Sequence, residues 1–461
     1  MSRSAVVSLI AAASIVLAVA PRARGAASEP ASWRGDVRFL GAAVDSIHPA
    51  PYRFFKRAAW DSATADIERR LPGLRADQAI AALSQLLGML RDGHTRLGQL
   101  QLPSHGRPAL TPLPWPGFDT AYPLEFEVFA DGLWIVGATE AHAHLTGTRV
   151  LAIGGRPVAE AVAALAPFIP ADNPMWTLRA LPVYLRCPGY LAAAGLTPTP
   201  DAPLRIKVAT GTGGRRDVKI AAEKPDSTAT WLAADRGTRA PLPLTRRLDY
   251  PFAFTNLDDS TVFVRIQAIV DEQGHEPVAA FVARLFAHVD SLRSPRLVLD
   301  LRGNGGGNNY LNQPLVHAIL RRPAFDRPGR LFVIIDRGTF SAAVSLSTDL
   351  ERETRAVFVG EPTGGAPNSP GDPARIRLPA SDLGVRISTV MWTGSDPRDP
   401  RAFIAPDLPA MPTFADWLAH RDPALDAIRS YRPRADAPDV PPNQHWGIPA
   451  RLKAAPPKIG W

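Results

Sequence analysis

The sequence predicts a mixed α/β protein built from a helical part, a β-rich part and an α/β core, in that order. Between residues 77 and 90, leucine and isoleucine recur every three or four positions, which is the spacing of one helix face. Residues 124–129 alternate apolar and polar side chains, and an Asp–Gly pair at 131–132 and an apolar segment at 133–136 follow, which is typical of a β-hairpin. From residue 261 onward, short apolar strands alternate with amphipathic helical segments. That alternation indicates an α/β core.

The first 26 residues have the pattern of a secretory signal peptide. Arg3 precedes an apolar run over residues 5–20, and small residues follow at 23–27. The run is too short and too rich in alanine for a typical membrane span, although an uncleaved anchor is the alternative. We therefore expect residues 1–26 to be removed. The mature protein should then be periplasmic or secreted and should have no integral membrane span.

An N-terminal helical domain is expected over residues 33–100. Asp77 can cap the helix that carries the leucine stripe, and Gly93 is expected to end it. Residues 92–96 then form a turn. The following stretch, 103–123, is rich in proline and should break regular structure.

A β-rich middle module is expected over residues 124–222. After the first hairpin, residues 147–158 form a strand that leads into a short helix, and residues 205–221 form a closing hairpin. The α/β core is expected over residues 256–430. The tail, residues 436–461, is rich in proline and is expected to be extended or loosely ordered.

The composition excludes several classes of protein. The chain has 461 residues, 46% of them hydrophobic, and a net charge of +8, but no basic run with interleaved aromatic residues that would indicate nucleic-acid binding. Cys187 is the only cysteine, so a disulfide framework is excluded and a buried structural role is expected. His142 and His144 have no carboxylate or cysteine nearby to complete a ligand set, so no metal site is expected.

The most informative segment runs from Arg296 to Asn308. It is a short apolar strand that ends in a polar turn and a run of glycines. Glycine backbone N–H groups approach a ligand closely, and two of them aimed at one point stabilise an oxyanion. The run lacks the lysine and serine of a P-loop, so a phosphate cradle is not favoured. A plain turn is the remaining alternative.

Ser341 is the candidate nucleophile. It follows an apolar strand and a turn that contains Gly338, and it begins an amphipathic helix. The amide of Ala342 then lies at a helix N-terminus, where unpaired N–H groups favour anions. A serine in this place serves as a nucleophile with its neighbour's amide as an oxyanion donor. The alternative is that Ser341 only caps the helix.

Four motifs occur along the chain in a fixed order: Asp92–Thr95, Val298–Gly307, Gly338–Ala343 and Val359–Gly365. Together they resemble those of the tail-specific, or C-terminal processing, serine peptidase family, which includes the tricorn core. The resemblance implies a crotonase-like ββα core, polypeptide substrates and no cofactor. Residues 147–158 resemble part of a PDZ domain, which implies a PDZ-like middle module.

The resemblance also implies roles for individual residues. Ser341 matches the family's nucleophile. Gly305 and Gly306, with the amide of Ala342, match its oxyanion hole. Val344 stands where many members of the family carry glutamate, so this chain departs from the pattern there.

The largest departure concerns the general base. The processing peptidases carry a lysine after their Gly-Glu-Pro-Thr-x-Gly motif, and this chain has Ala366 there. The tricorn-like branch uses a histidine instead, and His94 is the best match. Histidine titrates near neutrality, which suits general-base work; a purely structural histidine is the alternative. Glu361 and Asp372 are both candidates for an orienting acid.

These observations predict an exported serine-type peptidase. One rival is a catalytically impaired binding protein on the same fold that holds an apolar ligand or a peptide, because the family lysine is missing. Another is an enzyme for a non-peptide acyl substrate. For coenzyme A, Arg302 alone is thin support as a phosphate-binding group, and export argues against it.

Overall fold

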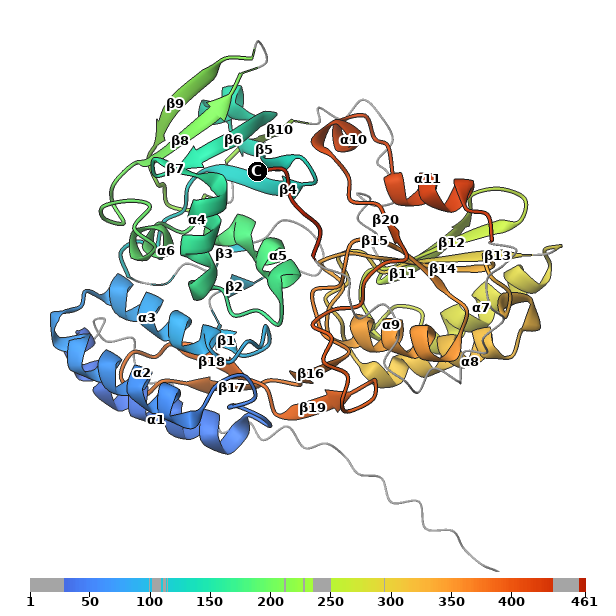
Figure 1. The fold of residues 1–461 in the computed structure, drawn as a ribbon, viewed down its shortest axis with the longest axis horizontal. Helices are drawn as coiled ribbons and strands as arrows, with labels where there is room; N and C mark the ends of the chain where they lie inside the picture. The colour runs from blue at the N-terminus through green and yellow to red at the C-terminus, as the bar shows by residue number, and fades with distance from the viewer. Residues whose placement is uncertain are drawn as a thin grey trace, which may run out of the picture.

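The computed structural model describes residues 29–433 and 456–461, apart from 99, 102–108, 111–112, 114, 211–212, 227–228, 235–249 and 294. The expected signal peptide and most of the expected tail lie outside the described residues. Within the described ranges, no helix is long and apolar enough to cross a membrane. The prediction of a mixed α/β protein is confirmed (Figure 1).

The N-terminal part is helical, as predicted. Its helices are η1 (Pro30–Trp33), α1 (Arg34–Ile47), α2 (Arg57–Arg70), η2 (Leu71–Gly73) and α3 (Ala76–Gly88). Two predicted details were wrong. The N-cap of α3 is Arg75, whose N–H donates to the Gln78 side chain, and Asp77 lies in the first turn, paired with Arg75. The helix ends at Gly88, and Arg91 in the following turn has a positive φ of 51°.

The middle module contains both predicted hairpins. Its sheet has the order β10-β5-β6-β8-β9. In addition, β4 pairs with β5, and β7 pairs with β6. Its strands are β4 (Leu124–Phe129), β5 (Gly132–Thr139), β6 (Thr148–Ile153), β7 (Arg156–Pro157), β8 (Leu204–Ala209), β9 (Arg215–Ile220) and β10 (Trp231–Ala233). Its helices are η3 (Glu140–Leu145), α4 (Val158–Leu165), η4 (Ala166–Phe168), α5 (Pro174–Tyr184) and α6 (Pro188–Ala193). The sequence pattern predicted α4 but not α5 and α6.

The core is a six-stranded sheet with the order β11-β12-β13-β14-β15-β20, parallel except for β11. The strands are β11 (Phe252–Asn256), β12 (Thr261–Ile266), β13 (Arg296–Asp300), β14 (Leu331–Ile335), β15 (Val357–Gly360) and β20 (Leu408–Pro409). The helices are α7 (Val278–Asp290), η5 (Asn309–Asn312), α8 (Gln313–Leu320), η6 (Pro323–Phe325), α9 (Ala342–Glu353), α10 (Phe414–Leu418) and α11 (Pro423–Ser430). Apolar side chains of α7, α8 and α9 cover one face of the sheet, and those of α11 pack on the other.

The strand register explains why two distant motifs meet. β13 and β14 are parallel, and Asp300 lies opposite Ile334, so both strands end at the same edge. The glycine run follows β13 and the Ser341 turn follows β14. The Phe340 N–H donates to the carbonyl of Asn304 at 2.9 Å, which fixes the two loops together. Ligand sites of parallel sheets lie at this carboxyl edge.

After β15 the chain leaves the core sheet and returns to the N-terminal helices. β16 (Asn368–Gly371) pairs with β19 (Val390–Thr393), and β17 (Ala374–Arg377) pairs with β18 (Gly384–Ile387). β18 also pairs with β1 (Arg96–Leu97), directly after the predicted 92–96 turn. Asp36 of α1 accepts hydrogen bonds from the amides of residues 380 and 381. Figure 1 shows β17 and β18 beside the N-terminal helices.

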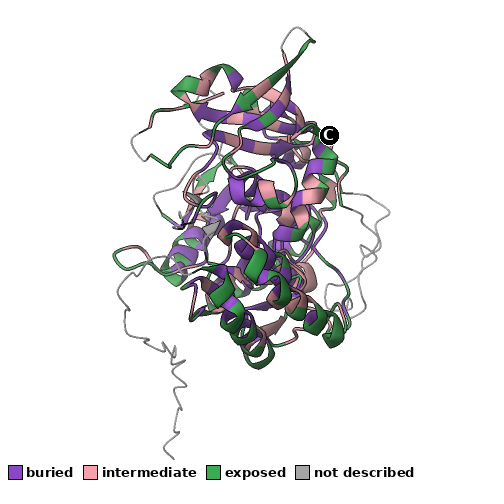
Figure 2. Ribbon diagram, turned by 90° about the vertical axis from the view of Figure 1, so that its left-hand side faces the viewer, coloured by how far each residue is buried: buried purple, intermediate pink, exposed green. Residues whose placement is uncertain are grey.

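Strand β2 (Leu100–Gln101), just before the proline-rich stretch 103–123, pairs with β3 (Ala109–Leu110) inside it, where regular structure was not expected. Cys187 is buried and forms no disulfide, as expected. Figure 2, which views the molecule from the left-hand side of Figure 1, shows buried residues along the strands and exposed residues along the outer side of the helices that face the viewer.

Candidate active site

Ser341 has a strained backbone and an unengaged hydroxyl group. Its φ and ψ are 54° and −127°, in a region that non-glycine residues rarely adopt. It occupies the N-cap position of α9, but its side chain makes no capping hydrogen bond. The interpretation of Ser341 as a simple helix cap is therefore wrong. Strain of this kind at a half-buried serine is typical of a functional position.

The glycine run packs directly against Ser341. A Cβ added to Gly306 would lie 2.6 Å from the Ser341 Cβ and 2.9 Å from the backbone nitrogen of Ala342. Only glycine fits here, because φ at Gly306 is 107° and the space is filled. The Gly306 N–H donates to the Asn304 side chain at 2.9 Å. Among the described residues, the amides of Gly305 and Ala342 have no such acceptor.

His94 reaches this region from the turn after α3. Its ring stacks on that of Phe340, with 4.5 Å between centroids, and Trp176 stacks on Phe340 at 3.9 Å. Phe340 directly precedes Ser341. No hydrogen bond joins His94 to Ser341 in the structure. The aromatic contact therefore links the candidate base to the segment of the candidate nucleophile.

Asp92 lies beside His94 in the same turn. Its Oδ1 lies 3.6 Å from the His94 Nδ1 and accepts the His94 N–H at 2.9 Å. Its Oδ2 accepts hydrogen bonds from His48, Thr95 and Ser388. Burial alone would raise the pKa of Asp92, but hydrogen bonds from His48, His94 and Ser388 outweigh it and hold this pKa well below its usual range. Asp92 is therefore an ionised carboxylate beside the imidazole.

The orientation of His48 is defined by its neighbours. The Ala50 N–H donates to the His48 Nδ1 at 3.2 Å, so the Nε2 carries the proton that faces Asp92 in neutral His48. His48 thus acts as a buried donor to Asp92.

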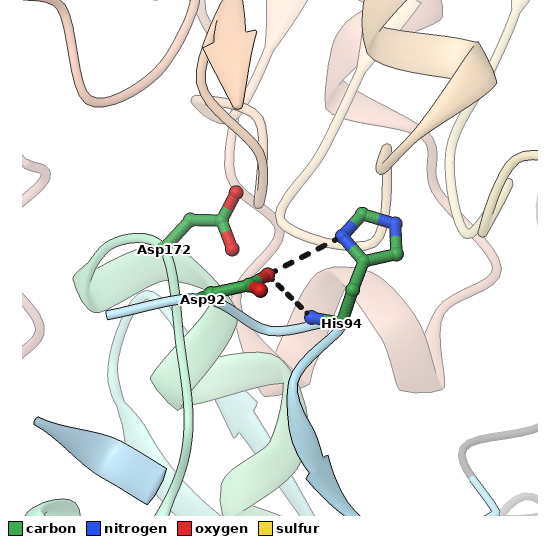
Figure 3. Close-up of side chains that lie close together, drawn as sticks. All are labelled: Asp92, His94 and Asp172. Atoms are coloured by element: carbon green, nitrogen blue, oxygen red, sulfur yellow. Dashed lines mark hydrogen bonds and ion pairs between the residues drawn. The ribbon is translucent and has the colours of Figure 1, made fainter. Parts of the chain in front are cut away.

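A second carboxyl group, Asp172, joins Asp92 and His94. One polar atom of each of these three residues lies within 4.8 Å of the others, and Figure 3 shows them converging. This set of His and Asp atoms is of a type that holds a metal ion. However, both Asp92 oxygens already accept hydrogen bonds, which leaves few lone pairs for a cation. The arrangement fits acid–base chemistry better.

The two predicted candidates for the orienting acid lie elsewhere. Glu361 is paired with Arg337, with 3.6 Å between the Oε2 and the Nε, and burial raises the pKa of Glu361 to about 7. Asp372 is exposed, and its carbonyl accepts a hydrogen bond from Thr389. No hydrogen bond or ion pair joins Glu361 or Asp372 to His94 in the structure. Asp92 was already present in the recognised motif, whereas nothing local in the sequence pointed to Asp172.

Arg337 connects the middle module to the Ser341 turn. It is buried, and its guanidinium donates to the carbonyl of Val128 and to the Glu127 carboxylate, both on β4. The charge of Glu361 lies on its other side. Strand β4 is therefore in direct contact with the loop that leads to the candidate nucleophile.

No protein-family model and no curated protein matches the chain. Its fold is similar to that of CPAF. Mature CPAF complexed with lactacystin and mature CPAF alone each align with a TM-score of 0.57 and 14% identity, over 87% of this chain and 97% and 95% of theirs. A serine-to-alanine mutant of CPAF aligns with a TM-score of 0.56 and 12% identity, over 88% of this chain and all of that one. At these identities the likeness shows a shared fold.

Proposed function

We propose that this protein is a serine-type peptidase of the tail-specific kind, in which Ser341 is the nucleophile, His94 the general base and Asp92 the acid that orients the base. The observation that carries the proposal concerns Ser341 at the start of α9. Its backbone is strained, its side chain makes no capping hydrogen bond, and Gly306 packs against it. His94, which has the ionised carboxylate of Asp92 beside it, stacks on Phe340, the residue that precedes Ser341. These are the parts that acyl transfer requires.

In the proposed reaction the Ser341 Oγ attacks the carbonyl carbon of a peptide bond, and its proton passes to the Nε2 of His94. The carbonyl oxygen becomes an oxyanion, which the free amides of Gly305 and Ala342 stabilise. Gly306 is not a donor in this proposal, because its own N–H is held by Asn304; its missing side chain lets Ser341 and the Ala342 amide lie close to the glycine run. Asp92 balances the charge of the imidazolium. The proton on His94 then passes to the leaving amine.

The finer architecture belongs to the same proposal. We assign residues 256–430 as a crotonase-like core, 124–222 as a PDZ-like module and 33–100 as the N-terminal domain. Polypeptide substrates follow from the family resemblance, and export with removal of residues 1–26 follows from the signal-peptide pattern of the N-terminus. No cofactor has a part in this reaction, and nucleic acid is not a partner.

One observation favours the rival function, a binding protein without activity. His94 and Ser341 are not hydrogen-bonded to each other. Catalytic hydrogen bonds in ligand-free enzymes are often long, however, and tighten only when substrate binds. The unengaged hydroxyl and the two free amides therefore support the enzyme.

The test is labelling with a fluorophosphonate, in which the Ser341 Oγ forms a bond to phosphorus and fluoride leaves. Wild type should be labelled at Ser341, Ser341→Ala should not, and the matched control Ser345→Ala, one turn later on α9, should label like wild type. Cleavage of internally quenched peptides by the same preparations would establish peptidase activity. Absence of wild-type labelling, or equal labelling of Ser341→Ala, would overturn the proposal.

A further inference from the structure

Asp172 joins two parts of the proposed active site that are far apart in sequence. The residue is buried, with 8% of its surface exposed. Its Oδ1 accepts the Gly93 N–H at 2.7 Å, and the backbone N–H of Ala366 also donates to its carboxyl group. Gly93 precedes the candidate base. Ala366 occupies the position at which related peptidases carry their lysine.

The neighbouring residue fixes the place of Asp172. The side chain of Asn173 caps α5, accepting hydrogen bonds from two amides of its first turn. The same side chain donates to the carbonyls of Thr363, Gly364 and Ala402. The backbone at Asp172 is therefore anchored to the 363–366 loop.

Two buried polar atoms beside Asp92 have no hydrogen-bond partner. They are the Oδ2 of Asp172 and the Nδ1 of His94. An unpaired buried polar atom is costly and uncommon, so two of them in one small volume indicate a functional arrangement. Figure 3 shows the Asp172 carboxyl group beside that of Asp92, on the side from which the His94 ring approaches.

The surroundings favour a protonated Asp172. Burial raises the pKa of Asp172, the negative charge of Asp92 raises it further, and only His94 opposes this among nearby charges. His48 lies beyond Asp92, and the 363–366 loop contributes the Ala366 amide to this site. Two adjacent buried carboxyl groups do not both ionise easily, and Asp92 has the better donors.

We propose that Asp172 is a positioning residue that acts in its protonated form, holding the His94 turn against the Ala366 loop and leaving Asp92 as the single ionised carboxylate beside the base. This inference rests on the proposed roles of His94 and Ser341. During proton transfer from the Ser341 Oγ to the His94 Nε2, Asp172 keeps its own proton. Asp172 fixes the position of the His94 ring. Because it carries no charge, it does not stabilise the imidazolium of His94 and so does not hold the proton there.

The test compares Asp172→Asn with Asp172→Ala. Asparagine has the shape of a protonated carboxyl group and keeps the oxygen that accepts from Gly93. Alanine removes this oxygen and the hydrogen bond with it. We measure the rate of Ser341 labelling by a fluorophosphonate from pH 5 to 9. Asp172→Ala should lose about tenfold or more at every pH, and Asp172→Asn should recover most of that loss. Asp172→Asn should also keep the pH dependence of wild type, because its uncharged side chain reproduces the proposed protonated form of Asp172.

Asp259→Asn, at an exposed position, is the control and should keep the wild-type profile. Circular dichroism and thermal unfolding show whether each variant folds, and the rate and pH profile of Asp172→Asn decide the question if the alanine variant does not fold. Identical rates and profiles in wild type and both variants would overturn the inference while the proposed function stands. A loss in Asp172→Asn as large as in Asp172→Ala would overturn the protonated form. Absence of labelling in wild type would instead overturn the proposed function, and the inference with it.

Discussion

The imidazole ring of His94 lies against the phenyl ring of Phe340, with 30° between the ring planes. Phe340 directly precedes Ser341. A shift of the His94 turn is therefore expected to change the position of Ser341 through this ring contact, although no hydrogen bond joins His94 to Ser341. Asp92 fixes this turn. It accepts one hydrogen bond from Thr95, in the same turn, and another from Ser388, which follows β18. Base and nucleophile thus depend on contacts from three separate stretches of the chain.

Removal of the base should abolish both activity and its pH dependence. Only a neutral imidazole accepts the Ser341 proton, so wild-type labelling should rise as pH increases and the imidazole loses its proton. His94→Ala should fall by about 100-fold or more and lose this rise. His144→Ala, at an exposed histidine of η3, serves as the control. Equal, pH-independent labelling of His94→Ala and wild type would remove His94 from the mechanism.

Gly306→Ala should impair the site more than it impairs the fold. The new Cβ would collide with Ser341 and with the Ala342 amide, so labelling should fall by about 100-fold, as when an oxyanion donor is lost. Gly303→Ala is a matched control: φ there is 68°, but a Cβ meets nothing within 4 Å. It should cost about 1 kcal/mol of unfolding free energy and keep activity. If both variants retain wild-type labelling, Gly306 has no role beside the nucleophile.

Glu361→Gln should stabilise the protein at alkaline pH only. A buried carboxyl group with a raised pKa binds its proton more tightly in the folded state, so stability decreases as pH rises from the unfolded pKa of Glu361 to its folded pKa of about 7. Above that pH the ionised Glu361 costs wild type at most about 3 kcal/mol of unfolding free energy, with the attraction of Arg337 already included, and Glu361→Gln removes this cost. Thermal midpoints at pH 5 and pH 8 measure this. The exposed control Glu160→Gln should change neither, and an equal shift of Glu361→Gln at both pH values would contradict the prediction.

Chelation should leave the activity intact. The oxygens of Asp92 are already engaged by protein donors, so the Asp92, His94 and Asp172 set is expected to work without a metal ion. Labelling rates measured before and after dialysis against EDTA should agree. A loss on chelation that zinc or manganese restores would assign these residues to a metal site instead.

The mature protein should begin near Ala26 or Ala27. The motivation is the apolar run after Arg3, followed by small residues. N-terminal sequencing of protein from the native host provides the measurement. Exported protein that still begins at Met1 or Ser2 would show that residues 1–26 are retained.

Local patterns predicted the two hairpins of the middle module, the alternating strands and helices from β12 to β15 and the residues around the candidate nucleophile, because these depend on neighbours in sequence. They did not predict the strands and helices that follow β15. The approach of Gly306 to Ser341 follows from two parallel strands that end at one edge. Asp172 could not be predicted in this way: it lies 79 positions from Gly93, and only the tertiary fold joins them. The return of β17 and β18 to the N-terminal helices was missed for the same reason. The predicted Asp77 cap failed because Gln78 bonds back to Arg75 and moves the helix start.

The position of Arg337 limits how this protein can be divided. A fragment consisting of residues 256–430 alone would retain the nucleophile and the glycine run but lose the β4 acceptors, Glu127 and Val128, leaving a buried guanidinium with fewer partners. It would also lack His94. Neither half of the chain holds a complete set of reacting groups. The proposed chemistry therefore requires the N-terminal part, which carries His94, and the core, which carries Ser341, to be folded against each other in one chain.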